Sequence, residues 1–295
     1  MKGFELHQAV MVDQVINHLI LNKQGNYVDC TFGLGGHTSA ILDNLGPQGF
    51  LTSIDRDSAS TEIAIKISLE DKRMRFINDS FGNLESHCER NSLDGVLLDL
   101  GISSNQLDDP KRGFSFRNSG PLDMRMDQKS FLSAEFWLNN SSKEEIEKVL
   151  RQIGEERQSR KIASLICSTR LKRPIQTTKE LSDIILSCKG TASIKHPATN
   201  IFRAIRMKIN SEIEELHSVL KAVGRVLKIG GRLAVISFHS LEDRVAKRFI
   251  QGKDGAGFDS TFKLVGGKPI KPDKSEIDDN PRSRSAILRI AERIT

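Results

Sequence analysis

Two segments of this chain contain residues of the type and spacing found in nucleoside-binding sites. The first, Asp29-Cys30-Thr31-Phe32-Gly33-Leu34-Gly35-Gly36-His37, lies between a strand-like segment and a helix-like run that starts at Thr38. Glycines in such a turn let backbone amides approach a ligand closely, and a helix start adds N–H groups that have no partner inside the helix. The second is Asp55, which follows Gly35 by twenty residues and ends a predicted strand. A carboxylate there can accept hydrogen bonds from ribose hydroxyls.

The spacing of the glycines distinguishes between cofactors. A dinucleotide fingerprint would need a third glycine at Thr38, whereas this chain has adjacent glycines at Gly35 and Gly36. S-adenosylmethionine (SAM) has no pyrophosphate, so the loop that binds it need not cradle one. The pattern therefore favours SAM and disfavours a dehydrogenase, with an ordinary tight strand-to-helix turn as the alternative.

A polar loop after a third strand could hold the group that accepts the methyl. Asp99 lies at the end of a predicted apolar strand within Gly95–Leu100, and the residues after it include Ser103, Ser104 and Asn105. In a doubly wound sheet, ligands bind at this carboxyl edge. The exocyclic amine of cytosine is a poor nucleophile because its lone pair is conjugated with the ring. Hydroxyl, amide or carbonyl acceptors can hold its N–H groups and free the lone pair to attack a sulfonium methyl, so these three residues are the candidate catalytic residues. The alternative is a polar loop in which Ser103 or Ser104 caps a helix.

The cysteines favour nitrogen over carbon as the methyl acceptor. Carbon methylation of cytosine usually needs a cysteine nucleophile. Cys30 lies in the glycine motif, Cys88 in a polar stretch, and Cys167 and Cys188 on apolar helical faces; none follows a proline in an acceptor loop. Because no C-x-x-C pair is present, we expect neither structural zinc nor a disulfide framework, and no metal.

Four aromatic side chains have a structural and a functional interpretation. His239 follows a predicted strand and is the second candidate site histidine, with a position beside a helix N-cap as the alternative. We expect Phe131, Phe136 and Trp137 to belong to a hydrophobic core and not to stack on bases.

The elements that position these residues predict an α/β fold with an insertion. Strand and helix patterns alternate up to Gln106, which is typical of a parallel sheet. Three helices then follow without a strand, one of them opened by the capping box Ser142-x-x-Glu145. The α/β alternation returns with a helix over 210–227, a strand over 232–238 and a last strand over 285–291, while 251–284 resembles a long loop. We therefore expect a sheet domain over 1–106 and 208–295 and an inserted helical domain over 107–207.

Charge is distributed unevenly along the 295 residues, although the net charge is only +6. Residues 1–110 contain 8 Lys and Arg against 16 Asp and Glu, whereas residues 111–252 contain 27 against 15. A basic middle indicates a polyanion such as RNA, with solvated helix faces as the alternative. No apolar run is long enough to span a bilayer and the N-terminus lacks a signal-peptide core, so we expect a cytoplasmic protein.

Long blocks of the sequence resemble the bacterial 16S ribosomal RNA cytosine-N4 methyltransferases, nearly from end to end. Besides the glycine segment, the blocks are Ile54-Asp55-Arg56-Asp57, Leu98-Asp99-Leu100-Gly101-Ile102-Ser103-Ser104, Arg112-Gly113-Phe114-Ser115-Phe116, Gly120-Pro121-Leu122-Asp123-Met124-Arg125-Met126-Asp127, His196-Pro197-Ala198-Thr199, Ser237-Phe238-His239-Ser240-Leu241-Glu242-Asp243-Arg244 and Asn280-Pro281-Arg282-Ser283-Arg284-Ser285. Two positions depart from the family pattern: Asn105 stands where proline is common, and Cys30 where glycine is common.

The resemblance implies a Rossmann-like SAM-dependent methyltransferase fold, with a doubly wound, mostly parallel sheet, an antiparallel last strand and an inserted all-helical domain. It implies N4-methylation of a cytosine in the decoding centre (P-site region) of 16S rRNA in the small subunit. The family's cofactor contacts map onto Gly35, Gly36, His37, Asp55, Phe81, Asp99 and Gln106.

The basic residues Arg112, Arg203, Arg206 and Lys208 would hold RNA phosphates. A homodimer stays open. The alternatives are a DNA amino-methyltransferase, which would need an Asp/Ser-Pro-Pro-Tyr motif, and a non-catalytic RNA-binding ribosome assembly factor with a vestigial nucleoside pocket.

Overall fold

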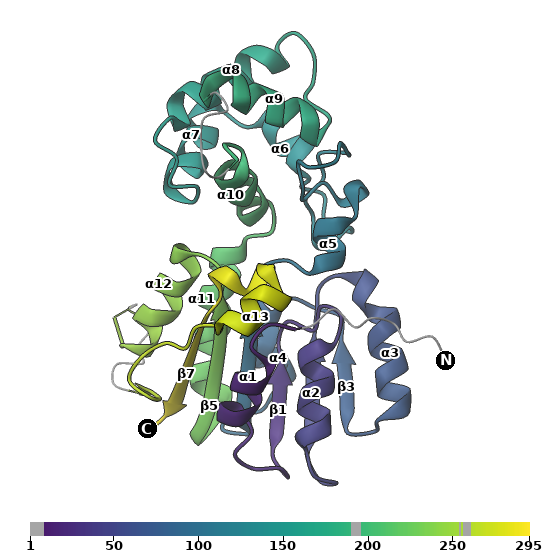
Figure 1. Cartoon of the computed structure of the whole chain (residues 1–295), viewed down its shortest axis with the longest axis vertical. Coiled ribbons are helices and arrows are strands. Elements are labelled where there is room, and N and C mark those ends of the chain that lie inside the picture. Colours follow the sequence, from purple (N-terminus) through teal and green to yellow (C-terminus); the bar gives the residue numbers. More distant parts are fainter. Residues whose placement is uncertain (1–8, 190–195, 254, 256–260) are drawn as a thin grey trace. The chain divides into compact units, whose positions relative to one another are not determined.

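The chain folds into two compact units in a computed structural model that describes residues 9–189, 196–253, 255 and 261–295. The sheet unit comprises Met1–Gly101 with Ile213–Thr295, and the helical unit comprises Ile102–Glu212 (Figure 1). The helical unit extends a few residues beyond the predicted 107–207 at both ends, because Ile102 and Ile209 pack into its hydrophobic core.

The sheet unit contains seven described strands in the order β3-β2-β1-β4-β5-β7-β6. The first five strands along the chain pair in parallel, and β7 pairs antiparallel with both β5 and β6. The predicted doubly wound, mostly parallel sheet with an antiparallel last strand is therefore confirmed. The strands are β1 (Asn26–Asp29), β2 (Phe50–Ile54), β3 (Met74–Ile77), β4 (Leu93–Asp99), β5 (Leu227–Ser237), β6 (Phe262–Leu264) and β7 (Ile287–Arg293).

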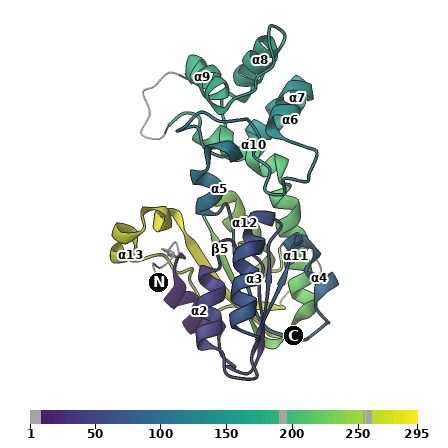
Figure 2. The same ribbon diagram turned by 90° about the vertical axis from the view of Figure 1, so that its right-hand side faces the viewer.

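Helices cover both faces of this sheet, which explains why β4 is a continuous apolar run. Successive side chains of a strand point to opposite faces, so a strand between two helical layers needs apolar residues at every position. Val96 and Leu98 pack into one core with α4 (Leu84–His87), α11 (Glu212–Val226) and α12 (Ser240–Ile250). Leu97 packs into the other core with α1 (Val12–Leu19), α2 (Gly36–Asn44) and α3 (Thr61–Glu70). Figure 2 shows α2 and α3 on one side of the sheet and α4 and α11 on the other.

The helical unit contains more helices than the three that the sequence predicts. Half of the predicted capping box at Ser142 is present: the Ser142 hydroxyl accepts the Glu145 N–H at 3.1 Å, whereas the Glu145 carboxylate accepts from the Trp137 indole. Of the other three described helices, α5 starts in the predicted acceptor loop, for which a capped helix was the alternative interpretation. α6 is too short for a periodic pattern, whereas the apolar residues Ile201, Ile205 and Ile209 could have revealed α10. The helices are α5 (Ser104–Asp108), α6 (Ala134–Asn140), α7 (Lys143–Gln152), α8 (Ser159–Arg170), α9 (Thr178–Lys189) and α10 (Thr199–Ile209).

The prediction of three core aromatics in this unit was right for one of them. Trp137 is buried, and its indole N–H donates to Glu145 at 2.8 Å. Phe131 and Phe136 are 77% and 41% exposed and contact each other edge-on. The buried face of the seven-residue helix α6 consists of Ala134, Trp137 and Leu138, which have i, i+3, i+4 spacing, and Phe136 lies outside this face.

The segment 251–284 is not one long loop, as the sequence suggested. Its described part contains β6, helix α13 (Lys274–Asp279) and the start of a 3-10 helix, η4 (Pro281–Ser285). Across the described residues, no helix combines the length and apolar character that crossing a membrane requires.

Candidate active site

The glycine loop joins β1 to α2 through two residues with left-handed backbone. Gly33 and Gly35 have φ of 55° and 82°, a region that side chains with a Cβ adopt rarely. A Cβ on Gly35 would also lie 2.9 Å from Ile67 Cδ1 and 3.0 Å from the Phe32 ring. The loop therefore needs glycine at these positions. It ends at Gly36, the first residue of α2.

Thr38, where a dinucleotide fingerprint would have glycine, has a structural role of its own. Its Oγ1 lies 2.8 Å from Asp29 Oδ2 and 2.8 Å from Ser53 Oγ, and all three residues are buried. The contacts join α2 to the ends of β1 and β2. Burial raises the pKa of the Asp29 carboxyl, although the hydrogen bonds from Thr38 and Thr31 oppose the shift.

Asp55 links the end of β2 to the glycine loop. Its Oδ2 accepts the Gly33 N–H at 2.7 Å and its Oδ1 accepts the Asp57 N–H at 2.8 Å, while the Ser60 hydroxyl lies 3.3 Å from Oδ2. Burial raises the pKa of Asp55 to about 6, even though these hydrogen bonds favour the ionised form. The carboxylate is thus a preorganised acceptor with further lone pairs that a ligand could use.

The buried His37 and the partly buried Asp99 form a polar pair beside the loop. His37 Nε2 lies 3.5 Å from Asp99 Oδ2, but the two ring nitrogens and Asp99 Oδ1 have no hydrogen-bond partner among the described residues. Burial is the largest single effect on the pKa of His37 and lowers it. The carboxylates of Asp99, Asp29 and Glu276 together outweigh burial, so the pKa of His37 is raised overall. Buried polar atoms without partners are rare in proteins, so three of them at one loop indicate a polar ligand.

The turn that carries Phe81 is held by residues distant in the sequence. Glu215, on α11, accepts hydrogen bonds from the Ser80 hydroxyl and, at 3.0 Å, from the Gly82 N–H. A Cβ on Gly82 would lie 2.1 Å from Glu215 Oε2, so only glycine allows this approach. The Arg56 guanidinium lies 6.0 Å from the centre of the Phe81 ring and 3.4 Å from Glu215 Oε1. Sequence reasoning missed Glu215, for which no local signal exists.

The predicted acceptor loop belongs to both units. Asp99 and Gly101, whose φ is 109°, lie in the sheet unit, whereas the residues from Ile102 onward lie in the helical unit. Ser103 and Gln106 form a capping box: Ser103 Oγ accepts the Gln106 N–H at 3.3 Å, and Gln106 Oε1 accepts the Ser103 N–H at 3.0 Å. The helix-cap alternative therefore describes Ser103 correctly, and the side-chain oxygen of the buried Gln106 serves the fold.

The other two candidate catalytic residues, Ser104 and Asn105, stand at the start of α5, where Ser104 is partly buried and Asn105 is exposed. Asn105 is therefore the residue of this loop whose side chain is most open to a substrate.

The four predicted phosphate-binding residues lie in the helical unit, and most of them are engaged in it. Arg112 is only 8% exposed and donates to the carbonyl groups of residues 125 and 126 at 3.0 and 3.1 Å, which leaves it little surface for a phosphate. Arg206 forms a two-pronged ion pair with Glu212 at 2.8 and 2.7 Å. Arg203 is partly buried. Lys208 is 38% exposed and lies 3.6 Å from a Glu145 oxygen.

His239 caps α12 with its own side chain. Its Nδ1 accepts the Glu242 N–H at 3.4 Å, and its Nε2 lies 3.1 Å from the Glu242 carboxylate. The ring is thus used by the fold, as the structural alternative predicted. Within the described residues, no group of three or more His, Cys, Asp or Glu could hold a metal ion.

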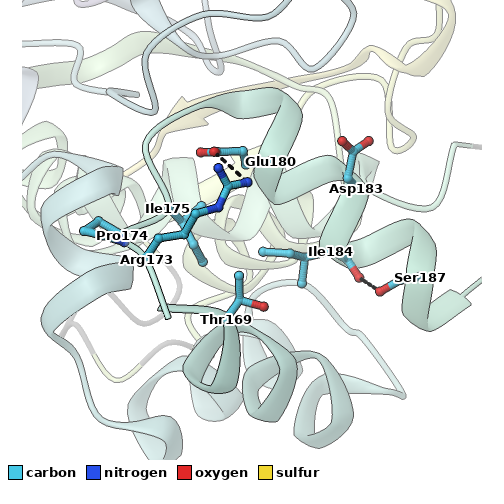
Figure 3. A pocket seen from close by; sticks show the side chains of 8 residues that line it. All are labelled: Thr169, Arg173, Pro174, Ile175, Glu180, Asp183, Ile184 and Ser187. Atoms are coloured by element: carbon cyan, nitrogen blue, oxygen red, sulfur yellow. Dashed lines mark hydrogen bonds and ion pairs between the residues drawn. The ribbon is translucent and has the colours of Figure 1, made fainter. Parts of the chain in front are cut away.

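A separate cavity of about 250 Å³ lies in the helical unit between α8 and α9 (Figure 3). Arg173 and Glu180 form an ion pair of 3.2 Å beside it. None of the predicted site residues lines it; the lining residues are Thr169, Arg173, Pro174, Ile175, Glu180, Asp183, Ile184 and Ser187.

Comparison with known proteins relates this geometry to a family. Residues 5–294 match the family described as the MraW methylase family. The chain belongs to this family. A curated MraW-family relative, "Ribosomal RNA small subunit methyltransferase H" of Coxiella burnetii, is 43% identical over 99% of this chain and 100% of its own length. The protein of the same name from Thioalkalivibrio sulfidiphilus is 44% identical over 98% of this chain and 97% of its own.

Solved structures share less with this MraW-family chain. A SAM-dependent methyltransferase from Aquifex aeolicus has a TM-score of 0.45 and 10% identity, covering 97% of this chain and 90% of its own. An rRNA methylase from Streptococcus thermophilus has a TM-score of 0.42 and 12% identity, covering 96% and 94%.

Proposed function

We propose that this chain transfers a methyl group from SAM to the exocyclic N4 amine of a cytosine in the decoding centre (P-site region) of 16S rRNA, within the small ribosomal subunit. The observation that carries the proposal is the full-length membership of the MraW methylase family, with relatives named as rRNA small subunit methyltransferases. The sheet unit supports it with a glycine loop whose neighbouring polar atoms lack partners.

The residues of the sheet unit fit SAM. The amide of Gly36, the first residue of α2, can meet a polar group of the cofactor, whereas the Gly35 N–H donates to the Phe32 carbonyl at 2.7 Å within the turn. Asp55 can accept from the ribose hydroxyls of the cofactor. His37 and Asp99 offer a donor and an acceptor to the amino-acid part, which would satisfy their buried atoms. When bound, SAM supplies an activated methyl group on a positively charged sulfur.

The cysteines described above support nitrogen as the acceptor. Cys30 is buried beside the glycine loop, and burial raises the pKa of its thiol well above the ordinary value. Burial also raises the pKa of Cys88. Both thiols stay protonated near neutral pH, whereas carbon methylation would need a thiolate. Attack by an exocyclic amine needs acceptors for its N–H groups, which the Asn105 side chain and the backbone carbonyls after Asp99 can supply. No side-chain base is required, since the methylated amine is acidic and can lose its proton to water.

The charge of the helical unit supports a nucleic-acid substrate. Residues 102–212 contain 20 Lys and Arg against 13 Asp and Glu, an excess that the rest of the chain does not share. A basic unit in the same chain as a nucleoside-binding sheet suits a substrate with many phosphates.

Mass spectrometry of nucleosides tests the proposal. Small subunits from cells that lack this protein are incubated with the purified chain and SAM, and their rRNA is digested. We expect N4-methylcytidine to appear in subunits treated with the wild-type chain and to stay absent with the Asp99→Ala variant. Binding of SAM without any N4-methylcytidine would instead support the non-catalytic assembly factor, and activity on DNA alone would support a DNA amino-methyltransferase.

A further inference from the structure

Three aromatic rings form a column from the core of the helical unit to its surface. Phe202 is 3% exposed within the core, and the Phe116 ring contacts it edge-on with a centroid distance of 5.1 Å. The His196 ring stacks on Phe116 at 4.4 Å, with an angle of 20° between the ring planes. His196 itself is exposed. One face of its imidazole therefore rests on protein, and its exposed area lies on the edge and the other face.

Local hydrogen bonds hold the His196 ring in this orientation. Its Nδ1 accepts the Ala198 N–H at 3.3 Å, which leaves Nε2 to carry the proton of the neutral ring. Its backbone carbonyl accepts the Thr199 N–H at 3.0 Å. A ring fixed in advance loses little conformational freedom when a flat ligand stacks on it, which favours binding.

The surroundings of His196 suit a nucleotide. α10 begins at Thr199, and its N-cap residue Ala198 makes no side-chain cap. Because the Ala198 and Thr199 amides already donate to His196, the helix start can offer a phosphate its dipole and the amides that follow Thr199. The unit also has the basic excess described above. Proteins that read unpaired RNA stack its bases on aromatic side chains, His included.

We infer that His196, supported by Phe116, stacks against an unpaired base of the substrate RNA, with the start of α10 beside the phosphate of that nucleotide. This inference rests on the proposed function for the identity of the RNA, since the column alone would take any unpaired base. The site adds a contact to single-stranded RNA that does not depend on the arginines of α10.

Three variants of His196 separate stacking from a structural role. His196→Phe keeps a ring but cannot accept the Ala198 N–H, His196→Asn keeps an acceptor but has no ring, and His196→Ala has neither. The probes are small subunits from cells that lack this protein and a uridine hexanucleotide with one internal 2-aminopurine, whose fluorescence falls on stacking. SAM affinity and thermal unfolding are measured for each variant as controls for the fold.

We expect His196→Phe to bind both probes as the wild type does. The Ala and Asn variants should bind them about 5- to 150-fold more weakly, as for the loss of one stacked base. They should also leave 2-aminopurine unquenched. Wild-type binding by the Asn variant together with loss in the Phe variant would overturn the inference, as would equal binding by all three or no binding of either probe by the wild type. The proposed function is judged separately, by N4-methylcytidine in subunits treated with the wild-type chain, so either idea can fail alone.

Discussion

Protonation of Asp55 should control SAM affinity between about pH 4 and 6. The pKa of this carboxyl rises from 3.8 to about 6 in the folded chain. Since burial favours the neutral form, ionising Asp55 costs the free fold about 3 kcal/mol. That cost develops as pH rises from 4 to 6 and is constant above. Ribose hydroxyls donate to the carboxylate, so SAM binding should lower the pKa again and affinity should fall as pH drops below 6.

The Asp55→Asn variant measures this contribution. Hydrogen bonds to a charged group contribute about 1.5–3 kcal/mol, so at pH 7.5 the variant should bind SAM about 10- to 150-fold more weakly. The NH₂ group of the introduced asparagine side chain would face either the Gly33 N–H or the Asp57 N–H, and losing that hydrogen bond costs about 1–3 kcal/mol of folding free energy. The substitution also removes the cost of the buried charge. The two effects nearly offset each other, so the variant should stay folded.

The assay is calorimetric SAM titration from pH 4.5 to 8 for wild type, Asp55→Asn and the control Asp57→Asn. Asp57 is a buried neighbour whose carboxylate caps the 3-10 helix Ser58–Ser60. Titration of His37, whose pKa is raised, occurs in all three proteins and cancels in the difference. Relative to Asp55→Asn, the wild type and the control should lose affinity toward low pH, so that their profiles converge on that of the variant. Parallel pH profiles for wild type and Asp55→Asn would refute the ribose role.

Three further outcomes are expected. Arg206→Ala should lower the free energy of unfolding by about 3 kcal/mol, because it leaves the largely buried Glu212 without its two-pronged partner; an unchanged urea midpoint would contradict this. Asn105→Ala should slow single-turnover methylation more than it weakens SAM binding, and a normal rate would remove this exposed side chain from the amine-holding site. Affinity for the small subunit should fall with salt while SAM affinity does not, and Lys208→Ala should reduce the log–log slope by about 0.7–0.9, which an identical slope would disprove.

Short sequence patterns were sufficient to predict most of the sheet unit. The glycines of the loop, Asp55 at a strand end and the apolar run of β4 are each short segments whose residue types report their own backbone conformation or burial. The hydroxyl of Thr38 even explains why the dinucleotide fingerprint is absent.

The sequence could not reveal contacts between distant segments or the partners of individual charges. Glu215 reaches the Phe81 turn from 135 residues away, so no window of sequence contains both partners. The basic excess counted Arg112 and Arg206 as free charges, although one is buried and the other is ion-paired. Phe131 was assigned to the core because its type is apolar, but it lies in a bend before α6 where its side chain is 77% exposed.

The insertion of the helical unit also affects how the sheet is completed during synthesis. β4 and β5 are neighbours in the sheet, yet the helical unit lies between them in the chain. The ribosome adds about 5–20 residues per second, so about 6 to 25 seconds pass between the synthesis of β4 and the synthesis of β5. Until β5 pairs with β4, residues 96–98, which are buried in the complete sheet, form an unpaired apolar edge that can promote aggregation. Closing a flexible loop of about 125 residues would cost about 4 kcal/mol in entropy, so prior folding of the helical unit shortens the search. The folding rate of the helical unit would thus set how long the sheet stays open.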